Sequence, residues 1–303
     1  MSWRCISFFD RSTFSGSSSR AGLESEGSVG MEKLKRALDM ARAGTTLQVI
    51  PGSMDGGAPR NVDSTSQAQT QSPTTQSWLV TMKPEHLREQ RVVLPQEKSP
   101  AAQTYRLLRT QVLQRARAED LRLIGIVGTM PGEGKTLTAV NLALAMAAEP
   151  NQTVLLVDLD LRRPSVATVL GIPPRKGVEA YLHGSADLAE LFCRLYGVNR
   201  LAILPAFNPM AATSEVLADQ RARSLLHELK SRYDDRFILI DLPPALTADD
   251  ALTVAPELDA VIVVAAEGRT RREDLRRLDA TLANVKIIGT VLNRASERQQ
   301  IVY

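Results

Sequence analysis

Short apolar runs separated by helical segments are the feature of this 303-residue sequence that most constrains its fold. Runs such as Val154–Val157, Phe237–Ile240 and Val261–Val264 are continuous rather than alternating, which is typical of strands buried on both faces of a mostly parallel sheet. The pattern therefore predicts an α/β protein of three layers, with helices covering both faces of the sheet. Strands are predicted at 122–128, 153–158, 201–204, 236–241, 259–265 and 286–292, and helices at 134–148, 187–195, 214–232, 248–255 and 270–283.

The first strand–helix junction, Gly128–Thr136, has the sequence Gly-Thr-Met-Pro-Gly-Glu-Gly-Lys-Thr, which is the context of a phosphate-binding P-loop. Glycines let backbone N–H groups face a phosphate, and the helix that follows begins with unpaired N–H groups. Lys135 is expected to reach the β- and γ-phosphates of ATP, and the Thr136 hydroxyl to ligate Mg²⁺. The strict pattern has glycine where this chain has Thr129. The residues whose backbone is expected to contact the phosphates are Pro131, Gly132, Glu133 and Gly134.

Three aspartates follow two of the predicted strands. Asp158 and Asp160 lie in Asp-Leu-Asp-Leu-Arg-Arg-Pro, and Asp241 lies in Ile-Asp-Leu-Pro-Pro, at the position of a Walker B aspartate. Side chains two apart on a strand share a face, about 7 Å from each other, so Asp158 and Asp160 are both expected to face the phosphate site. One of them can hold Mg²⁺ while the other accepts a proton from an incoming hydroxyl, and the residues alone leave these roles open.

Composition restricts the partners of the chain. The formal net charge is only +3, so no nucleic acid partner is expected. The two cysteines, Cys5 and Cys193, lie far apart and predict no disulfide framework, and Cys193 lies in an apolar helical pattern that predicts a core position. No apolar run reaches the roughly 18 residues of a membrane span, so any membrane association is expected to come through a partner.

The two ends of the chain differ in composition from the predicted P-loop domain at 78–293. Residues 1–30 show no defensible period and are interpreted as a mobile extension or an over-long gene start. Residues 31–44 read as a short amphipathic helix, either solvated or docked on a partner, and 45–77 as a disordered linker rich in Ser, Thr, Gln, Gly and Pro. The tail at 294–303 carries a single tyrosine, Tyr303.

The three motifs, together with a helix predicted from Pro100 to about residue 117, resemble bacterial tyrosine kinases, the P-loop autokinases of capsule and exopolysaccharide assembly. The resemblance covers about residues 90–293. It implies that Asp160 and Asp241 help to hold Mg²⁺, that Asp158 is the base that receives a tyrosine proton, and that Asn293 lies near adenine.

Family members work as rings in which the C-terminal tyrosines of one subunit enter the site of a neighbour. The resemblance thus implies a homo-oligomer with Arg106 and Arg109 at the contact, Tyr303 as phosphoacceptor, and a separate transmembrane polysaccharide chain-length or export protein as activator. The protein is expected in the cytoplasm, at the inner face of the plasma membrane through that partner. The chain departs from the family in two respects: its tail has a single tyrosine, and it has Gln103 where the ring-forming helix of the family carries Glu. The second departure matters because an amide pairs with the guanidinium of a neighbouring subunit more weakly than a carboxylate does.

Three functional hypotheses follow. The leading one is an ATP-dependent protein-tyrosine autokinase that regulates exopolysaccharide polymerisation and export. The second is an ATP-binding switch of a polysaccharide export complex that phosphorylates no tyrosine, which the missing tyrosine cluster motivates. The third is a partition or division-site ATPase, although that group usually places a second lysine where this chain has Thr129 and Met130.

Overall fold

The computed structural model describes residues 5–9, 77–232 and 236–295. Their nine strands form one sheet in the order β1-β9-β8-β3-β7-β4-β6-β5-β2. The six strands from β9 to β6 are parallel, whereas β1 and β5 run antiparallel to β9 and β6. The strands are β1 (Cys5–Phe9), β2 (Trp78–Val80), β3 (Leu123–Gly128), β4 (Thr153–Asp158), β5 (Cys193–Leu195), β6 (Val198–Leu204), β7 (Arg236–Asp241), β8 (Ala260–Ala266) and β9 (Ile287–Ala295).

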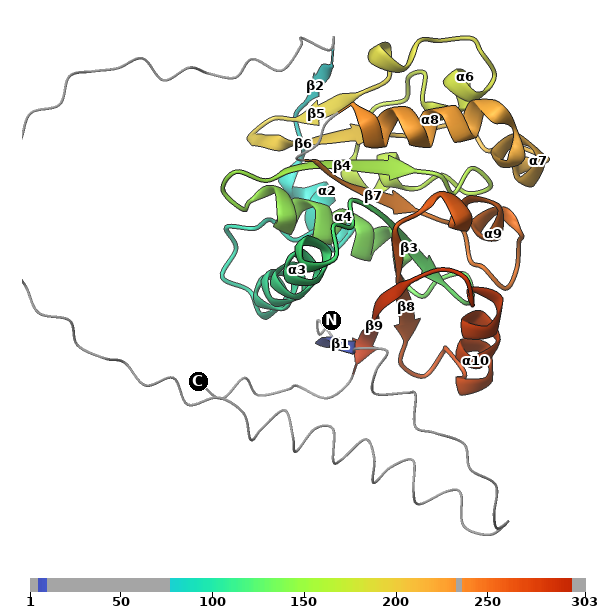
Figure 1. Ribbon diagram of the computed structural model, residues 1–303. Helices are drawn as coiled ribbons and strands as arrows, with labels where there is room; N and C mark the ends of the chain where they lie inside the picture. The colour runs from blue at the N-terminus through green and yellow to red at the C-terminus, as the bar shows by residue number, and fades with distance from the viewer. Residues whose placement is uncertain (1–4, 10–76, 233–235, 296–303) are drawn as a thin grey trace, which may run out of the picture. The chain divides into compact units, whose positions relative to one another are not determined.

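Helices cover both faces of this sheet (Figure 1). One apolar cluster joins α2 to α5 to one face, and a second joins α6 to α10 to the other. The helices are α2 (Pro84–Glu89), α3 (Pro100–Ala118), α4 (Lys135–Ala147), α5 (Val166–Leu170), α6 (Val178–Leu182), α7 (Thr213–Ala218), α8 (Gln220–Ser231), α9 (Asp250–Val254) and α10 (Arg272–Thr281), with the 3₁₀ turns η2 (Leu188–Glu190) and η3 (Ala255–Glu257).

Strand β3 shows why the apolar runs are continuous. Ile124 and Ile126 pack into one cluster, whereas Leu123 and Val127 pack into the other, so successive side chains alternate between the two faces of the sheet. A strand in this position has no solvent-facing side, and all six of its residues are buried. The predicted three-layer fold with a mostly parallel sheet is confirmed.

Two predicted helices are wrong. Residues 187–195 form η2 and then strand β5, in which exposed Arg194 lies between buried Cys193 and Leu195. Cys193 is therefore a core residue, as predicted, but it lies in a strand that pairs antiparallel with β6. The helix predicted at 214–232 is divided at Asp219, whose extended backbone ends α7 and whose carboxylate accepts the Arg221 N–H at the start of α8 (2.8 Å).

Several features were not predicted. Within 1–30, the structure describes Cys5–Phe9 as strand β1 on β9, and β9 itself continues to Ala295, inside the predicted tail at 294–303. The helix predicted at 31–44, the linker as far as residue 76 and Tyr303 lie outside the described residues. Within the described part of the chain, no helix is long and apolar enough to cross a membrane.

Candidate functional site

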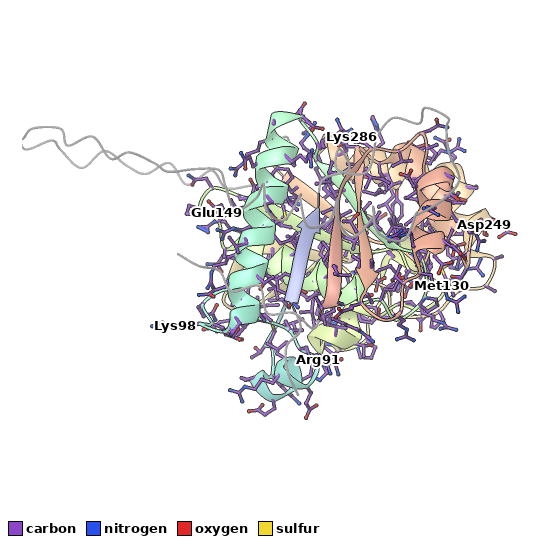
Figure 2. All side chains as sticks on the ribbon, turned by 90° about the horizontal axis from the view of Figure 1, so that it is seen from below. Arg91, Lys98, Met130, Glu149, Asp249 and Lys286 are labelled. Atoms are coloured by element: carbon purple, nitrogen blue, oxygen red, sulfur yellow. The ribbon has the colours of Figure 1, made fainter. Side chains whose placement is uncertain are left out.

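The three motifs meet at the carboxyl ends of adjacent parallel strands. Strand β7 lies between β3 and β4, and the register pairs Asp241 with Asp158 on one side and with Ile126 on the other. The P-loop follows β3 directly. Figure 2 shows Met130 of the P-loop and Asp249, just before α9, on the same side of the molecule, away from Lys98 and Glu149. The fold therefore agrees with the prediction that these motifs lie together at the carboxyl ends of the parallel strands.

The P-loop depends on glycines where the backbone has no room for a side chain. Gly134 has φ of 95°, and a Cβ there would lie 2.1 Å from Asn293 Nδ2. Gly128 is extended, but a Cβ there would lie 2.3 Å from Glu133 Oε2. A side chain at either position would displace a neighbour that shapes the loop. The loop is thus a close-fitting turn whose backbone leads straight into the first N–H groups of α4.

Lys135 lies under the loop with 6% of its surface exposed. Its Nζ donates a hydrogen bond to the Met130 carbonyl at 3.1 Å. Burial lowers the pKa of Lys135, while the negative charges of Asp241 and Glu133 act in the opposite direction. An anionic ligand at the loop would favour the charged lysine in the same way, which fits a phosphate site.

Asp241 is the residue whose surroundings best fit a bound cation. Its side chain is fully buried, and among the described residues neither carboxylate oxygen has a hydrogen-bond partner of good geometry. Burial raises the pKa of Asp241 to about 7, although the nearby Thr136 hydroxyl acts to lower it. That hydroxyl is 2.9 Å from Ser165 Oγ. Buried oxygen atoms without donors suit a hard cation, so Asp241, Thr136 and Asp160 fit a Mg²⁺ site.

Asp158 and Asp160 differ in their surroundings. Asp158 is fully buried, and its Oδ2 accepts the N–H groups of Ser165 and Val166, both at 3.0 Å. Burial, and next the charge of Asp241, raise the pKa of Asp158 well above its usual value. Strand β4 ends at Asp158, so Asp160 lies in the following turn, and the predicted shared strand face is wrong. Asp160 is half-buried, and burial raises its pKa too.

An ion pair that the sequence did not reveal fixes the turn after Asp160. Arg162 donates to both oxygens of Asp250, at 2.7 and 3.0 Å, and Thr213 Oγ1 donates to the same carboxylate at 2.8 Å. Asp250 is fully buried, and although burial alone would raise its pKa, the hydrogen bonds from Arg162 and Thr213 lower it. This fork ties the Asp-x-Asp-x-Arg segment to α7 and α9. No local pattern could have paired residues 88 positions apart.

The remaining predicted site residues contact the chain itself. Asn293 Nδ2 donates to the Glu133 carbonyl at 2.9 Å, so Asn293 lies against the P-loop, and its nearness to adenine stays a prediction. Arg106 donates to the carbonyls of Pro95 and Glu97, both at 3.1 Å. Arg109 pairs with Glu149 at 3.2 Å. The role of Arg106 and Arg109 in a contact between subunits stays a prediction.

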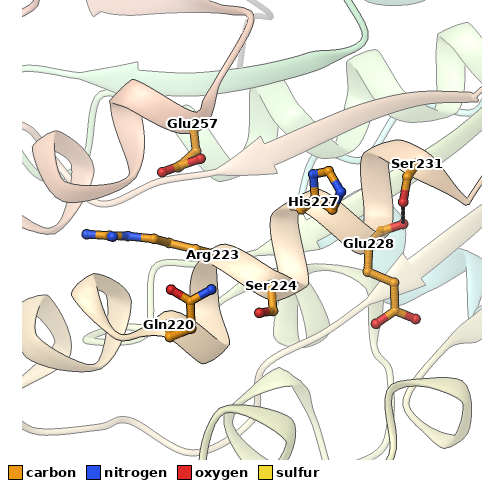
Figure 3. Close-up of a pocket in the computed structure, with 7 residues that line it drawn as sticks. All are labelled: Gln220, Arg223, Ser224, His227, Glu228, Ser231 and Glu257. Carbon is orange, nitrogen blue, oxygen red and sulfur yellow. Dashed lines mark hydrogen bonds between the residues drawn. The ribbon is translucent and has the colours of Figure 1, made fainter.

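A separate hollow of about 410 Å³ lies along α8 and faces η3 (Figure 3). Its walls come from α8 and η3, not from the strand ends that carry the P-loop and the aspartates, and we assign the nucleotide site to the P-loop. The residues that line the hollow are Gln220, Arg223, Ser224, His227, Glu228, Ser231 and Glu257.

Comparison with known proteins identifies the family of the chain. The AAA domain family matches residues 121–293. The succinoglycan biosynthesis transport protein ExoP of Rhizobium meliloti is 30% identical over 212 residues, which are 68% of this chain but only 26% of that protein, so the chain spans about a quarter of its length. The tyrosine-protein kinase YwqD of Bacillus subtilis is 27% identical over 67% of this chain and 84% of its own.

Solved structures give the same result. The kinase domain of the Escherichia coli tyrosine kinase ETK superposes with a TM-score of 0.62 and 25% identity, over 75% of this chain and 91% of that one. The septum site-determining protein MinD of Pyrococcus horikoshii, solved with Mg-ADP, has a TM-score of 0.50 and 27% identity, over 59% and 72%. The chain belongs to the AAA domain family and, within it, to the bacterial tyrosine kinases, with MinD as a structural relative.

Proposed function

We propose that this chain is an ATP-dependent protein-tyrosine autokinase that regulates exopolysaccharide polymerisation and export. The observation that carries the proposal is the buried Asp241 carboxylate, which has no hydrogen-bond partner of good geometry in the described part of the chain and stands beside Lys135 and Thr136. A kinase of this type needs a cation at its phosphate site, and these residues would supply ligands for it and the compensating charge.

The residues divide the chemistry among them. The P-loop N–H groups and Lys135 hold the phosphates of ATP, and Thr136, Asp160 and Asp241 hold Mg²⁺, which neutralises negative charge on the transferred group when bound. Asp158 accepts the proton of a tyrosine hydroxyl while the tyrosine oxygen bonds to the γ-phosphorus and the bond to ADP breaks. The raised pKa of Asp158 makes its carboxylate a stronger proton acceptor than an ordinary aspartate.

The assembly is part of the proposal. We place Tyr303 of one subunit in the site of a neighbour, within a homo-oligomer that forms through the helix of Arg106 and Arg109. A separate transmembrane protein of polysaccharide chain-length control or export activates it and brings it to the inner face of the membrane. The names of two relatives support the kinase activity and the link to polysaccharide export: YwqD is named a tyrosine-protein kinase, and ExoP a succinoglycan biosynthesis transport protein.

A second candidate is an ATP-binding switch that phosphorylates no tyrosine. Three observations favour it: a single tyrosine in the last ten residues, an exposed Gln103 on the ring-forming helix, and two arginines already bonded within the chain. The partition-type ATPase is weaker, because the half-exposed side chain in the P-loop is the apolar Met130 rather than a lysine. ATP hydrolysis stimulated by DNA would favour that third reading.

Mass spectrometry of the C-terminal peptide separates the first two candidates. The purified chain is incubated with Mg·ATP, with and without membranes of its host, beside the Lys135→Met variant. Phosphate on Tyr303 that requires Lys135 is the expected result. An unmodified Tyr303 under both conditions, with ATP still bound, would refute the autokinase and favour the switch.

A further inference from the structure

The side chain of Glu133, a residue of the P-loop, is directed into the protein interior. Its carboxylate is fully buried and accepts three hydrogen bonds. Oε1 accepts from Thr129 Oγ1 and Thr270 Oγ1, both at 2.5 Å, and Oε2 accepts from the Met130 N–H at 3.0 Å. The short O–H···O distances are those of hydrogen bonds to an ionised acceptor, which are about twice as strong as neutral ones.

Thr270 connects the P-loop to a distant part of the chain. It lies 137 residues after Glu133, in the turn between β8 and α10. The Thr270 hydroxyl also accepts the Ala266 N–H at 2.8 Å, which fixes it to the end of β8. In the same turn, Arg269 Nη1 donates to the Gly132 carbonyl at 3.3 Å. Two side chains from the β8–α10 turn, Arg269 and Thr270, therefore hydrogen-bond to the P-loop.

We propose that Glu133 is a positioning residue of the nucleotide site, whose buried carboxylate holds the P-loop against Thr270 and so arranges the N–H groups of the loop before a triphosphate binds. The proposal rests on the nucleotide-binding part of the proposed function and is independent of tyrosine phosphorylation. It assigns Thr129 and Thr270 as the two hydroxyl partners of that carboxylate.

Three further observations support a positioning role. A buried carboxylate is costly unless its lone pairs meet donors, and here the donors come from two segments, so both must be in place for the carboxylate to be satisfied. The carboxylate also has a dedicated space, since any Cβ at Gly128 would lie 2.3 Å from Oε2. Its charge additionally favours the protonated form of Lys135, the cation that faces the phosphates.

The test uses the full chain and substitutes the distant partner. Thr270→Val keeps the shape of the side chain and removes the hydroxyl, whereas Thr270→Ser keeps the hydroxyl. Thr281→Val is the matched control, because the exposed Thr281 hydroxyl donates to the Arg277 carbonyl of its own helix. Amide hydrogen exchange of the peptide that contains residues 128–134 is measured without nucleotide, and the Kd of a fluorescent ATP analogue is measured with Mg²⁺.

Thr270→Val is expected to accelerate exchange in that peptide and to weaken nucleotide binding about tenfold, while Thr270→Ser and Thr281→Val behave like the natural chain. Unchanged exchange would overturn the proposal, and so would faster exchange with an unchanged Kd. Thr129→Val, which removes the second hydroxyl, gives an independent reading should Thr270→Val fold poorly. A Tyr303 without phosphate would contradict the autokinase but would leave this measurement intact.

A double substitution tests whether Thr270 acts through Glu133 or affects nucleotide binding independently of it. If Thr270 acts through Glu133, Glu133→Gln combined with Thr270→Val should weaken binding no more than Glu133→Gln alone. Fully additive losses would show that the two residues act separately and would overturn the assignment.

Discussion

Asp158 and Asp241 are paired in register at the ends of β4 and β7 and both are fully buried, yet within the described residues only Asp158 accepts hydrogen bonds of good geometry. Two carboxylates in one buried site disfavour each other's ionised form, and the charge of Asp241 contributes to the raised pKa of Asp158. A cation held by Asp241 would remove this conflict. Binding of Mg²⁺ at Asp241 is therefore expected to depend on pH.

The stabilisation by Mg²⁺ is expected to grow with pH. Burial raises the pKa of Asp241 from 3.8 to about 7, so between these values the folded chain binds more protons than the unfolded chain. The contribution of this group to the free energy of unfolding therefore falls as pH rises through that window. Mg²⁺ binds the ionised form, so Mg·ATP should raise the unfolding temperature more at pH 8 than at pH 6. Thermal unfolding with and without Mg·ATP checks this, and equal shifts would contradict it.

Asp241→Asn should separate stability from function. The amide removes a buried charge that lacks donors, so the variant without ligand is expected to be more stable at pH 8, by about 1–3 kcal/mol. The same change removes a Mg²⁺ ligand and should abolish the stabilising effect of Mg²⁺ on nucleotide binding. Denaturant unfolding at pH 8 measures the first effect, and titration of a fluorescent nucleotide with and without Mg²⁺ measures the second. A less stable variant would contradict this account of Asp241.

Lys135→Met is expected to weaken Mg·ATP binding by roughly 100-fold, because the lysine is the buried cation that we propose binds the phosphates. Lys176→Met is a suitable control, since Lys176 is exposed and its Nζ donates to the Ser185 carbonyl at 3.2 Å. Equilibrium binding of a fluorescent ATP analogue compares the two variants. Similar affinities would show that the loop binds phosphate without Lys135.

Two glycines with positive φ provide a matched pair. Gly197 has φ of 80° and no atom within 4 Å of a Cβ built on it, whereas a Cβ at Gly134 meets Asn293. Gly197→Ala should cost about 1–2 kcal/mol of stability and leave nucleotide binding unchanged. Gly134→Ala should cost more and abolish binding. Unfolding and binding measurements on both variants decide whether the fit around the P-loop, or backbone strain alone, explains the glycines.

Removing the guanidinium of Arg162 is expected to destabilise the fold by about 2 kcal/mol, because it leaves the buried Asp250 without its main partner. The loss is smaller than for a fully buried ion pair, because the Arg162 side chain is 46% exposed. Arg200→Ala, at an exposed position of β6, serves as the control for Arg162→Ala. Chemical denaturation compares the two variants. A loss no larger than that of the control would show that the fork adds little.

The strand ends and the P-loop could be predicted because their signals are local. Continuous apolar runs locate β3, β4, β7, β8 and β9, and Gly-Lys-Thr after a strand locates the loop. Residues 187–195 could not be assigned in this way, since their apolar residues also follow a helical spacing, and Cys193–Leu195 is a strand because it pairs with β6 on one side and β2 on the other. The partnership of Glu133 with Thr270 spans 137 positions and leaves no periodic trace.

The pairing of β1 with β9 has a consequence for where this domain can be cut. Residues 5–9 precede the rest of the sheet by a long stretch of sequence, yet they cover the outer edge of β9. A protein trimmed to residues 77–303 would leave the N–H and C=O groups of that edge free to pair with another chain. The sheet is thus assembled from segments that are discontinuous in sequence, and we expect a trimmed version to be less soluble and to regain solubility when residues 5–9 are supplied as a peptide.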